Sequence, residues 1–428
     1  MHSDLATSGK RLCVLGGGGY LGQLLALSLQ REGHFVVLFD LHFQHFGNIR
    51  LDSKLCLKIT GSITNVDELR LALNGCDACF HLAGYGMSGG PSLDREKCFL
   101  VNVEGTRRAL DECRRARISR LVFTSSVMVI FDGNELDMAE EEGTPYIQKF
   151  GINAYAESKC FAEKMVLAAN DHRLATCALR LRGIYGPGEL RTVKRTADLC
   201  LRGVVKCTFG TRQRVPTQYS GADNTVQALM LAEKSLREGP ESRAAGKAYH
   251  IMDGEGPVDS FRFWYPLITA IGCPVPSVRI SFTFAYTLGI FFEFIYKFVG
   301  WEPFFTRYEV ALMGVPNTYS IERARRDLNY SPIPSSDQMA RTIEFLKQQL
   351  KDNGTTANSA QSKSIGGQWL RDRRWLFMAY LVEEAERAFR PFKWSLALVV
   401  LLLLLLLFTI FFNFFFFAPF SLNCPTAF

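Results

Sequence analysis

The sequence predicts an α/β protein built on a doubly wound parallel sheet, and three observations carry this prediction. Short apolar runs alternate with helical patterns over residues 10–185. The first apolar run ends in four consecutive glycines, which open a helical stretch. Each helical stretch is long enough to connect two parallel strands. Such alternation is typical of a parallel sheet with right-handed crossovers and helices on both faces.

The expected elements follow one another in regular order. Strands are expected at residues 11–15, 35–39, 55–60, 78–82, 121–124 and 176–180, where apolar and β-branched side chains gather. Helices are expected at residues 22–32, 66–73, 103–115 and 156–169. Residues 10–185 would form a Rossmann domain. Residues 186–350 would form a smaller substrate region, part of which returns to the sheet.

One stretch of that region, residues 279–301, is almost entirely apolar. Glu293 and Lys297 are spaced by four, which places both charges on one face of a helix and argues against a full membrane span. Two interpretations remain. The stretch is a lid or membrane-dipping helix, or it is an ordinary core helix.

Composition excludes several classes of protein. Of 428 residues, 48% are hydrophobic and 21% charged, which excludes a disordered chain. The 49 Lys and Arg exceed the 42 Asp and Glu only mildly, so nucleic acid is not an expected partner. The 12 cysteines are scattered and typical of reduced, structural thiols. No cluster of side chains indicates a metal site.

The C-terminal part of the chain predicts a membrane anchor. Residues 394–417 form a nearly continuous apolar run, about 36 Å long as a helix, which is enough to span a bilayer. Residues 351–393 would be a tether and a juxtamembrane segment, the latter an interfacial helix or a plain spacer. Six basic residues precede the span and none follows it, so residues 1–393 are expected in the cytosol, on an internal membrane such as the endoplasmic reticulum.

The glycines after the first strand indicate a dinucleotide site. Backbone N–H groups at the start of a helix attract a pyrophosphate, and glycines let it approach. The expected contacts lie at Gly16, Gly17, Gly19, Tyr20, Leu21 and Gly22. Asp40 ends the next strand, where a carboxylate binds ribose hydroxyls and repels a 2′-phosphate. We therefore expect NAD rather than NADP. The alternative is a glycine turn without a ligand.

Two further motifs carry chemistry. Tyr155 and Lys159 are spaced by four on a helical stretch, which puts them on one face. A nearby ammonium and an oxidised nicotinamide both favour the phenolate, so the tyrosine could act as a base. Ser125 and Ser126 end a strand 29 residues before the tyrosine and could bind the same substrate oxygen. The sequence alone does not decide between the two serines.

These motifs occur in an order that resembles the extended short-chain dehydrogenases/reductases. The chain is most similar to the 3β-hydroxysteroid dehydrogenase-like group, and within it to family 42E. The resemblance rests on LGGGGYLG at 15–22, HLAG at 81–84, VNVEGT at 101–106, FTSS at 123–126, YAESK at 155–159, GIYGPGE at 183–189 and IERARRDLNY at 321–330.

The resemblance implies a function and roles for individual residues. Tyr155 would take the proton of a secondary alcohol while hydride moves to NAD. Lys159 would bind the nicotinamide ribose, and Ser126, with Ser125 as its alternative, would orient the substrate oxygen. Ala83 and Asn102 would belong to the cofactor site, Asn102 by supporting its backbone. The family often forms homodimers through the helix that carries the tyrosine.

The implied substrate is lipophilic, most simply a 3β-hydroxy-Δ5-steroid. The alternatives are a sterol 4-carboxylate or another hydrophobic alcohol and, from a different class, a weakly catalytic NAD-binding tethered protein. Some positions depart from the family pattern: Leu15 replaces a threonine, Ser62 an acid, Leu181 a proline and Gly221 a histidine. These departures predict weaker cofactor binding or a reshaped pocket wall.

Overall fold

A computed structural model of the chain describes residues 9–148, 151–201, 203 and 205–356, with side chains to residue 349. The expected span at 394–417 and most of the expected tether lie outside these residues. The chain divides into two compact units, and the larger comprises residues 1–294 and 302–352. The fold described below belongs to this larger unit, apart from the last residues of helices α9 and α12.

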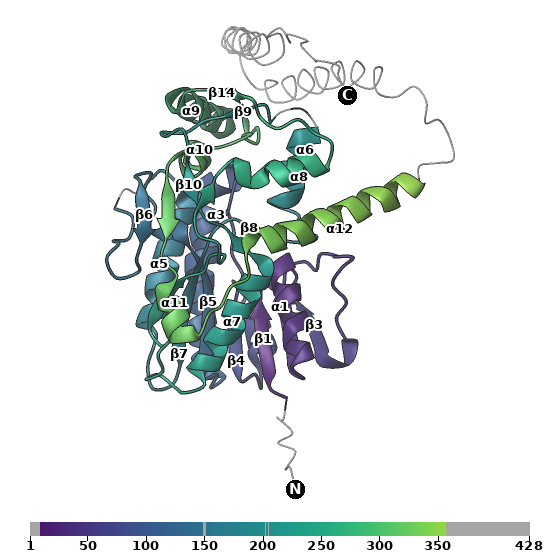
Figure 1. Cartoon of the computed structure of the whole chain (residues 1–428). Helices are drawn as coiled ribbons and strands as arrows, with labels where there is room; N and C mark the ends of the chain where they lie inside the picture. Colours follow the sequence, from purple (N-terminus) through teal and green to yellow (C-terminus); the bar gives the residue numbers. More distant parts are fainter. Residues whose placement is uncertain (1–8, 149–150, 202, 204, 357–428) are drawn as a thin grey trace. The chain divides into compact units, whose positions relative to one another are not determined.

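A seven-stranded sheet forms the centre of the unit, in the order β12-β7-β5-β4-β1-β2-β3 (Figure 1). All its strand pairs are parallel. The strands are β1 (Arg11–Leu15), β2 (Phe35–Asp40), β3 (Cys56–Thr60), β4 (Ala78–His81), β5 (Arg120–Ser126), β7 (Ala175–Leu181) and β12 (Lys247–His250). The order reverses at β1, which is where doubly wound sheets bind ligands. The predicted fold class and all six predicted strands are confirmed.

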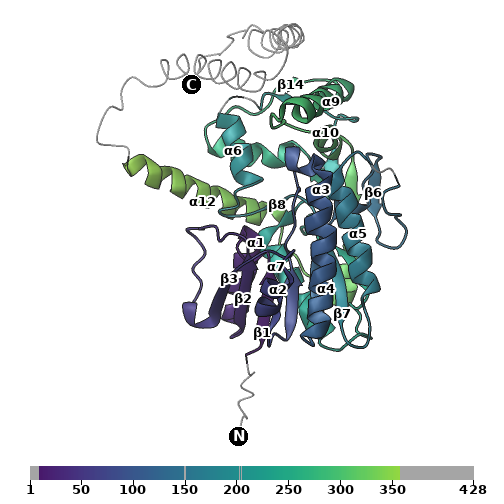
Figure 2. The ribbon, with the colours of Figure 1, turned by 180° about the vertical axis from the view of Figure 1, so that it is seen from behind.

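Helices cover both faces of the sheet. Figure 1 shows α7 (Ala222–Leu236) and α11 (Glu322–Leu328) in front, and α1 (Tyr20–Arg31) packs beside α7. Figure 2 shows α2 (Val66–Leu73), α4 (Gly105–Arg115) and α5 (Ala154–Ala168) on the other face. A short α3 (Arg95–Cys98) and a π-helix (Phe99–Glu104) precede α4. The first two residues of the helix predicted at 103–115 therefore belong to the π-helix, and the rest form α4.

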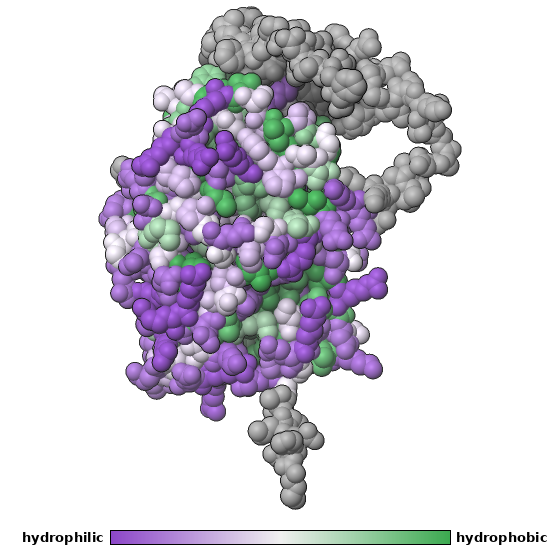
Figure 3. Space-filling view, in the orientation of Figure 1, coloured by the Kyte–Doolittle hydropathy of each residue, from purple (hydrophilic) through white to green (hydrophobic). Residues whose placement is uncertain are grey.

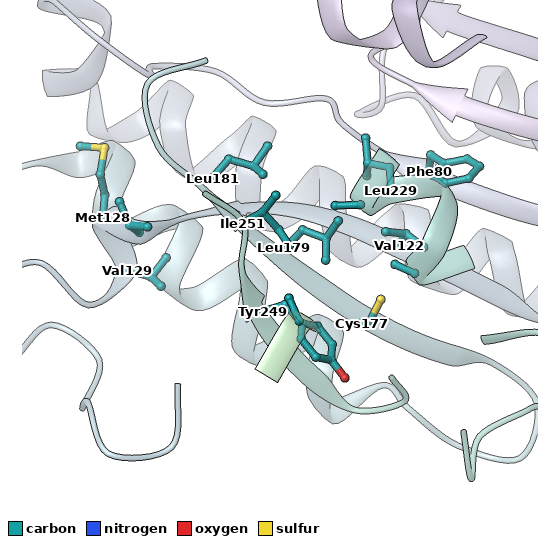
Figure 4. Close-up of a cluster of buried hydrophobic side chains, with 14 of the residues drawn as sticks. Phe80, Val122, Met128, Val129, Cys177, Leu179, Leu181, Leu229, Tyr249 and Ile251 are labelled. Atoms are coloured by element: carbon teal, nitrogen blue, oxygen red, sulfur yellow. The ribbon is translucent and has the colours of Figure 1, made fainter. Parts of the chain in front are cut away.

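The core consists of two layers because the central strands are buried on both faces. Leu12 and Val14 of β1 point to the α1 and α7 side, whereas Cys13 and Leu15 point to the α2 and α4 side. Figure 4 shows the first layer, in which Val122 and Leu179 lie near Leu229 of α7. Each fully buried side chain of this kind stabilises the fold by roughly 1.5–3 kcal/mol.

The smaller region is built mostly from residues after β7, together with the short strand β6 that precedes it, and the chain after β7 returns once to the main sheet. A four-stranded sheet contains β13 (Val258–Asp259), β10 (Pro216–Thr217), β15 (Asn317–Tyr319) and β6 (Leu136–Ala139). Two-stranded pairs join β11 (Ser220–Gly221) to β8 (Ile184–Tyr185) and β14 (Val278–Arg279) to β9 (Cys207–Thr208). The helices of this region are α6 (Val193–Leu201), α8 (Tyr265–Ala270), α10 (Arg307–Gly314) and α12 (Ser335–Thr356). The expected return to the sheet is β12, beside β7.

The apolar stretch of this region forms helix α9 (Phe282–Val299). Only 17% of its apolar window is buried, so the interpretation as a core helix is wrong. Phe284 is 47% exposed and Ile290 42% exposed. Glu293 is paired with Arg307, 3.0 Å away, so its charge is compensated within the protein. Figure 3 shows a mostly hydrophilic surface on which hydrophobic side chains also appear at the upper end.

Candidate active site and cofactor cradle

The glycine loop turns tightly between β1 and α1. Gly16 has a φ of 86°, and the amides of Gly16 and Gly17 both donate to the carbonyl of Phe39, at 2.8 and 3.0 Å. A Cβ on Gly16 would lie 2.6 Å from the amide nitrogen of Ala83, and one on Gly22 would lie 2.4 Å from the Gly16 carbonyl oxygen. Side chains are therefore excluded here, because the loop packs directly against the backbone that follows β4.

The start of α1 fits an anionic ligand. Its N-cap residue is Gly19, no side chain caps its N–H groups, and its first turn carries no acidic residue. A Cβ on Gly19 would meet nothing closer than 3.6 Å, so the backbone is open on that side. Uncapped N–H groups at a helix start are suited to a pyrophosphate. Gly19, Tyr20 and Leu21 contribute this part of the predicted cofactor site.

Asp40 lies beside the loop at the end of β2. Its Oδ2 atom accepts a hydrogen bond of 2.9 Å from the amide of Gly18. Gly18 has no room for a side chain, because a Cβ would lie 2.0 Å from the carbonyl oxygen of His42. Gly18 was missing from the predicted cofactor residues, although the run of four glycines already pointed to it. The structure thus brings the expected ribose-side carboxylate next to the glycine loop.

Asn102 ties the loop after β4 to helix α5. Its side chain donates to the carbonyl of Tyr85 and accepts from the amide of the same residue, both at 2.8 Å. It also donates to the Ser158 hydroxyl at 2.8 Å. Ala83 lies at the start of this loop, against Gly16. The amide side chain therefore holds backbone in place, which is the role the family resemblance implied.

Lys159 lies against strand β5 and is almost fully buried. Its Nζ atom donates to the carbonyl of Thr124 at 2.5 Å and lies 3.9 Å from the ring centroid of Phe123. Burial lowers the pKa of the Lys159 ammonium to about 7, while the carboxylate of Glu163 opposes that shift. The lysine is held toward β5, ready to donate a hydrogen bond at the strand end.

Tyr155, one turn earlier on α5, is also buried. Burial raises the pKa of its phenol, the charge of Arg191 lowers it, and Cys98 raises it. Arg191 was missed because no local pattern connects it to the tyrosine. It follows Glu189, whose carboxylate accepts from the amides of residues 191, 192 and 193 and so fixes the turn.

The two serines differ in their surroundings. Ser126 Oγ accepts from the amide of Met128 at 3.2 Å, which leaves its own proton available for a further acceptor. Ser125 Oγ is buried and has no hydrogen-bond partner among the described residues. Successive side chains of a strand point to opposite faces, so only one of the two can face the tyrosine.

His81 adds a buried network that sequence reasoning did not include. Its Nε2 atom is 2.9 Å from the hydroxyl of Thr106, which itself donates to the carbonyl of Asn102 at 2.6 Å. The hydroxyl proton is therefore used, so His81 Nε2 must carry the hydrogen. Burial and the charge of Lys159 lower the pKa of His81 to about 3, which keeps the ring neutral. The neutral ring is linked through Thr106 to the Asn102 carbonyl, and it adds no charge beside Lys159.

Two of the departures from the family pattern have a polar or acidic side chain close by. Ser62 donates its amide to the carboxylate of Glu68 at 2.7 Å, so an acidic group does lie at that position. Gly221 faces the side chain of Gln338, which donates to Asp253 at 3.1 Å. Leu181 is buried in the core at the end of β7, and Leu15 at the end of β1.

The remaining titratable groups do not form a metal centre. Across the residues that the structure describes, no group of three or more His, Cys, Asp or Glu side chains could hold a metal ion. The cysteines of that part are all free thiols.

The site combines the glycine loop at residues 16–22, the uncapped start of α1, the Asp40 carboxylate and the Tyr155–Lys159 pair. Together these features define an NAD-dependent oxidoreductase of the short-chain dehydrogenase/reductase type. The sequence profile of the 3-beta hydroxysteroid dehydrogenase/isomerase family matches residues 13–283. The chain belongs to this family.

Curated relatives extend the match over most of the chain. Short-chain dehydrogenase/reductase family 42E member 1 of Macaca fascicularis is 36% identical over 348 residues, which cover 78% of this chain and 86% of the relative. The sterol-4-alpha-carboxylate 3-dehydrogenase, decarboxylating, of Mus musculus is 31% identical over 80% of this chain and 92% of its own length. A 3-beta-hydroxysteroid dehydrogenase of Mycolicibacterium neoaurum is 31% identical, with the same coverage.

Solved structures share the fold at lower identity. The epimerase Mth375 of Methanothermobacter thermautotrophicus superposes with a TM-score of 0.63 at 20% identity, over 81% of this chain and 94% of that one. MoeE5 in complex with UDP-glucose and NAD gives a TM-score of 0.60 at 20% identity, over 79% of this chain and 99% of that one. At this identity the similarity shows the fold alone.

The residues of the site can together oxidise an alcohol. Bound NAD⁺ supplies the hydride acceptor. Tyr155 can accept the hydroxyl proton of a substrate, and the charge of Arg191 partly offsets the effect of burial, which raises the pKa of the phenol. Ser126 has a proton to donate to the substrate oxygen. Lys159 can donate to a ribose hydroxyl, and the buried surroundings of both side chains exclude bulk water.

Proposed function

We propose that the protein oxidises a secondary hydroxyl group of a lipophilic substrate, and that the substrate is a 3β-hydroxy-Δ5-steroid. The observation that carries this proposal is the setting of the catalytic pair. Tyr155 lies within the main apolar cluster, beside Met128 and Val129, and the region that would bind substrate presents the exposed apolar helix α9. Apolar walls with one polar reacting centre suit a steroid alcohol. Two relatives that act on steroids or sterols by name support the same class.

A second candidate substrate is a sterol that carries a carboxylate next to the alcohol. It is favoured by Arg191, the cation whose charge acts on Tyr155. A guanidinium whose charge acts on the reacting hydroxyl could pair with a substrate carboxylate. A neutral 3β-hydroxysteroid offers no such group, so the two candidates make different demands on this one residue.

The test uses the full chain, purified in detergent. NADH formation is followed after NAD⁺ is added with a panel of 3β-hydroxysteroids and 4-carboxysterols. Turnover that Tyr155→Phe reduces by about a thousandfold or more supports the enzyme. An Arg191→Gln variant then separates the candidates, because it should raise KM for a carboxysterol at least tenfold and leave a neutral steroid within about twofold.

A negative result would have a clear meaning. If the protein binds NAD⁺ but turns over no member of the panel, the steroid proposal fails. The remaining interpretation would be a weakly catalytic, NAD-binding protein that acts through interactions. Measurable NAD binding with intact Tyr155 and Lys159 but no activity is the result that would favour it.

We further propose that residues 394–417 anchor the protein in the endoplasmic reticulum membrane with residues 1–393 in the cytosol. The apolar run and the six basic residues before it support this topology. A glycosylation sequon appended after Phe428 tests it in microsomes. Modification of that tag is the expected result, whereas an unmodified tag with a protease-protected catalytic domain would reverse the orientation.

The family resemblance also leads us to propose a homodimer. Helix α5 carries the catalytic tyrosine, and Leu100, on the π-helix that packs against α5, is 47% exposed. Mass measurement in detergent should give twice the chain mass after subtraction of the micelle. Leu100→Glu should then yield monomers, and a wild-type protein that is already monomeric at micromolar concentration would contradict the proposal.

A further inference from the structure

The segment that enters the substrate region is fastened to the start of α1. The hydroxyl of Tyr20 donates to the carbonyl of Pro187 at 3.1 Å. The side-chain amide of Asn48 donates to the same carbonyl at 2.7 Å. One backbone oxygen therefore receives two donors, one from the first helical residue after the glycine loop and one from the connection between β2 and β3.

The fit around this oxygen excludes side chains on both sides of Pro187. A Cβ on Gly186 would lie 2.6 Å from the Tyr20 hydroxyl. Gly188 has a φ of 84°, and a Cβ there would lie 2.7 Å from Oδ1 of Asn48. The glycines of the GPG sequence thus allow the backbone to come close enough for both hydrogen bonds.

The connection that supplies Asn48 is itself tied to the glycine loop. The side chain of Gln23 donates to the carbonyls of Gly18 and Gln44, at 2.9 and 2.7 Å. The amide of Gln44 donates to the Gly18 carbonyl at 3.1 Å, and the ring of Phe46 packs edge-on against Tyr20 with centroids 5.5 Å apart. Three segments that are distant in sequence therefore meet at the helix start that receives the pyrophosphate.

We propose that Tyr20 and Asn48 form, with the carbonyl of Pro187, a clasp that controls how fast the dinucleotide enters and leaves. The uncapped amides of α1 would hold the pyrophosphate of a bound dinucleotide, and the 186–188 segment is bound to the residue that begins this helix. A dehydrogenase must release NADH after every turnover, and in this scheme the 186–188 segment parts from α1 to allow that release. Tyr20 and Asn48 are positioning residues in this scheme, because they act through Pro187.

The inference rests on the cofactor and not on the proposed substrate. Its test is accordingly the dissociation of NADH from the full-length, detergent-purified protein, without any steroid. Stopped-flow fluorescence during displacement by excess NAD⁺ gives the rate constant directly. A failure of the steroid proposal would leave this measurement unaffected.

The variants remove one hydrogen bond each. Tyr20→Phe and Asn48→Ala should each raise the rate constant of NADH release about fivefold, because each lost bond is a neutral one. Gly186→Ala, which pushes the segment away from Tyr20 and keeps both donors, should act in the same direction. Tyr265→Phe is the matched control, since the Tyr265 hydroxyl also approaches a proline carbonyl, that of Pro276 at 3.5 Å, within the substrate region. It should release NADH at the wild-type rate.

Two results would overturn the clasp. One is an unchanged release rate in Tyr20→Phe and Asn48→Ala. The other is acceleration by Tyr20→Phe alone, with Asn48→Ala and Gly186→Ala unchanged, because that pattern would mean a direct contact of Tyr20 with the cofactor. Thermal unfolding of every variant is measured alongside. If either Asn48→Ala or Gly186→Ala fails to fold, the other of the two decides together with Tyr20→Phe.

Discussion

Gln338 occupies the space that a side chain at position 221 would need. A Cβ built on Gly221 would lie 1.9 Å from Nε2 of Gln338. The same amide donates to Asp253, which also accepts from the amide of Gly221 at 2.8 Å and from the Tyr185 hydroxyl at 2.7 Å. Helix α12 is thereby fastened to the junction between the two regions of the fold.

We therefore predict that Gly221→Ala destabilises the protein by about 2 kcal/mol, because the added methyl group overpacks a filled site. Chemical denaturation of the catalytic unit measures the change. The double variant Gly221→Ala with Gln338→Ala should recover at least half of the loss, since the space is vacated. Strictly additive losses in the double variant would show that the two side chains do not compete for this space.

The carboxylate of Asp40 should set the preference for NAD. Asp40→Ala removes the charge that repels a 2′-phosphate and also frees the amide of Gly18. We expect kcat/KM with NAD⁺ to fall at least tenfold, and the NAD-to-NADP preference to fall by more than that, in steady-state assays with both cofactors. Asp67→Ala, an exposed carboxylate on α2, is the control. An unchanged cofactor preference in Asp40→Ala would contradict this role.

Alanine substitutions of Ser126 and Ser125 should have different effects on kcat. Ser126 keeps a proton to donate, so Ser126→Ala should lower kcat about a hundredfold with little change in NAD affinity. Ser125→Ala removes a buried hydroxyl that lacks a partner within the described residues, so it should leave kcat within about threefold and stability equal or higher. Reversal of these two effects would assign the substrate contact to Ser125.

His81 should make the free energy of unfolding fall as the pH is lowered. Its pKa in the fold is about 3, below the 6.5 of a free imidazole, so the unfolded chain binds a proton that the folded chain refuses. This contribution is complete above pH 6.5 and is lost as the pH falls toward 3. Between pH 7 and pH 5 it amounts to about 2 kcal/mol.

His81→Gln should remove that part of the acid sensitivity while its amide can still donate to Thr106. Denaturation curves at pH 7 and pH 5 for both proteins measure the difference. His250, whose pKa burial also lowers, contributes equally to both proteins and cancels in the comparison. An identical drop in stability for wild type and variant would show that His81 is not the group responsible.

Much of the fold could be predicted because its signals are local. The central strands are buried on both faces, so their sequences are nearly continuous apolar runs that are easy to recognise. The run of glycines indicates the turn into α1. The strand predicted at 121–124 is shorter than β5, which runs from Arg120 to Ser126. Arg120 and the two serines are polar, so their residue types gave no sign that tertiary contacts would bury them. The π-helix before α4 was missed because its residues read as ordinary helix formers.

The sequence by itself determined the α/β class, the glycine cradle with Asp40, and the Tyr155–Lys159 pair, because each depends on residues close together in the chain. The tertiary structure decided which distant groups act on them. The charge of Arg191 lowers the pKa of Tyr155, and His81 is linked to Asn102 through Thr106. Gln338 fills the space at Gly221, and the Pro187 carbonyl accepts from Tyr20. No local pattern encodes such pairs, because they form only when loops separated by many residues converge at the same edge of the sheet.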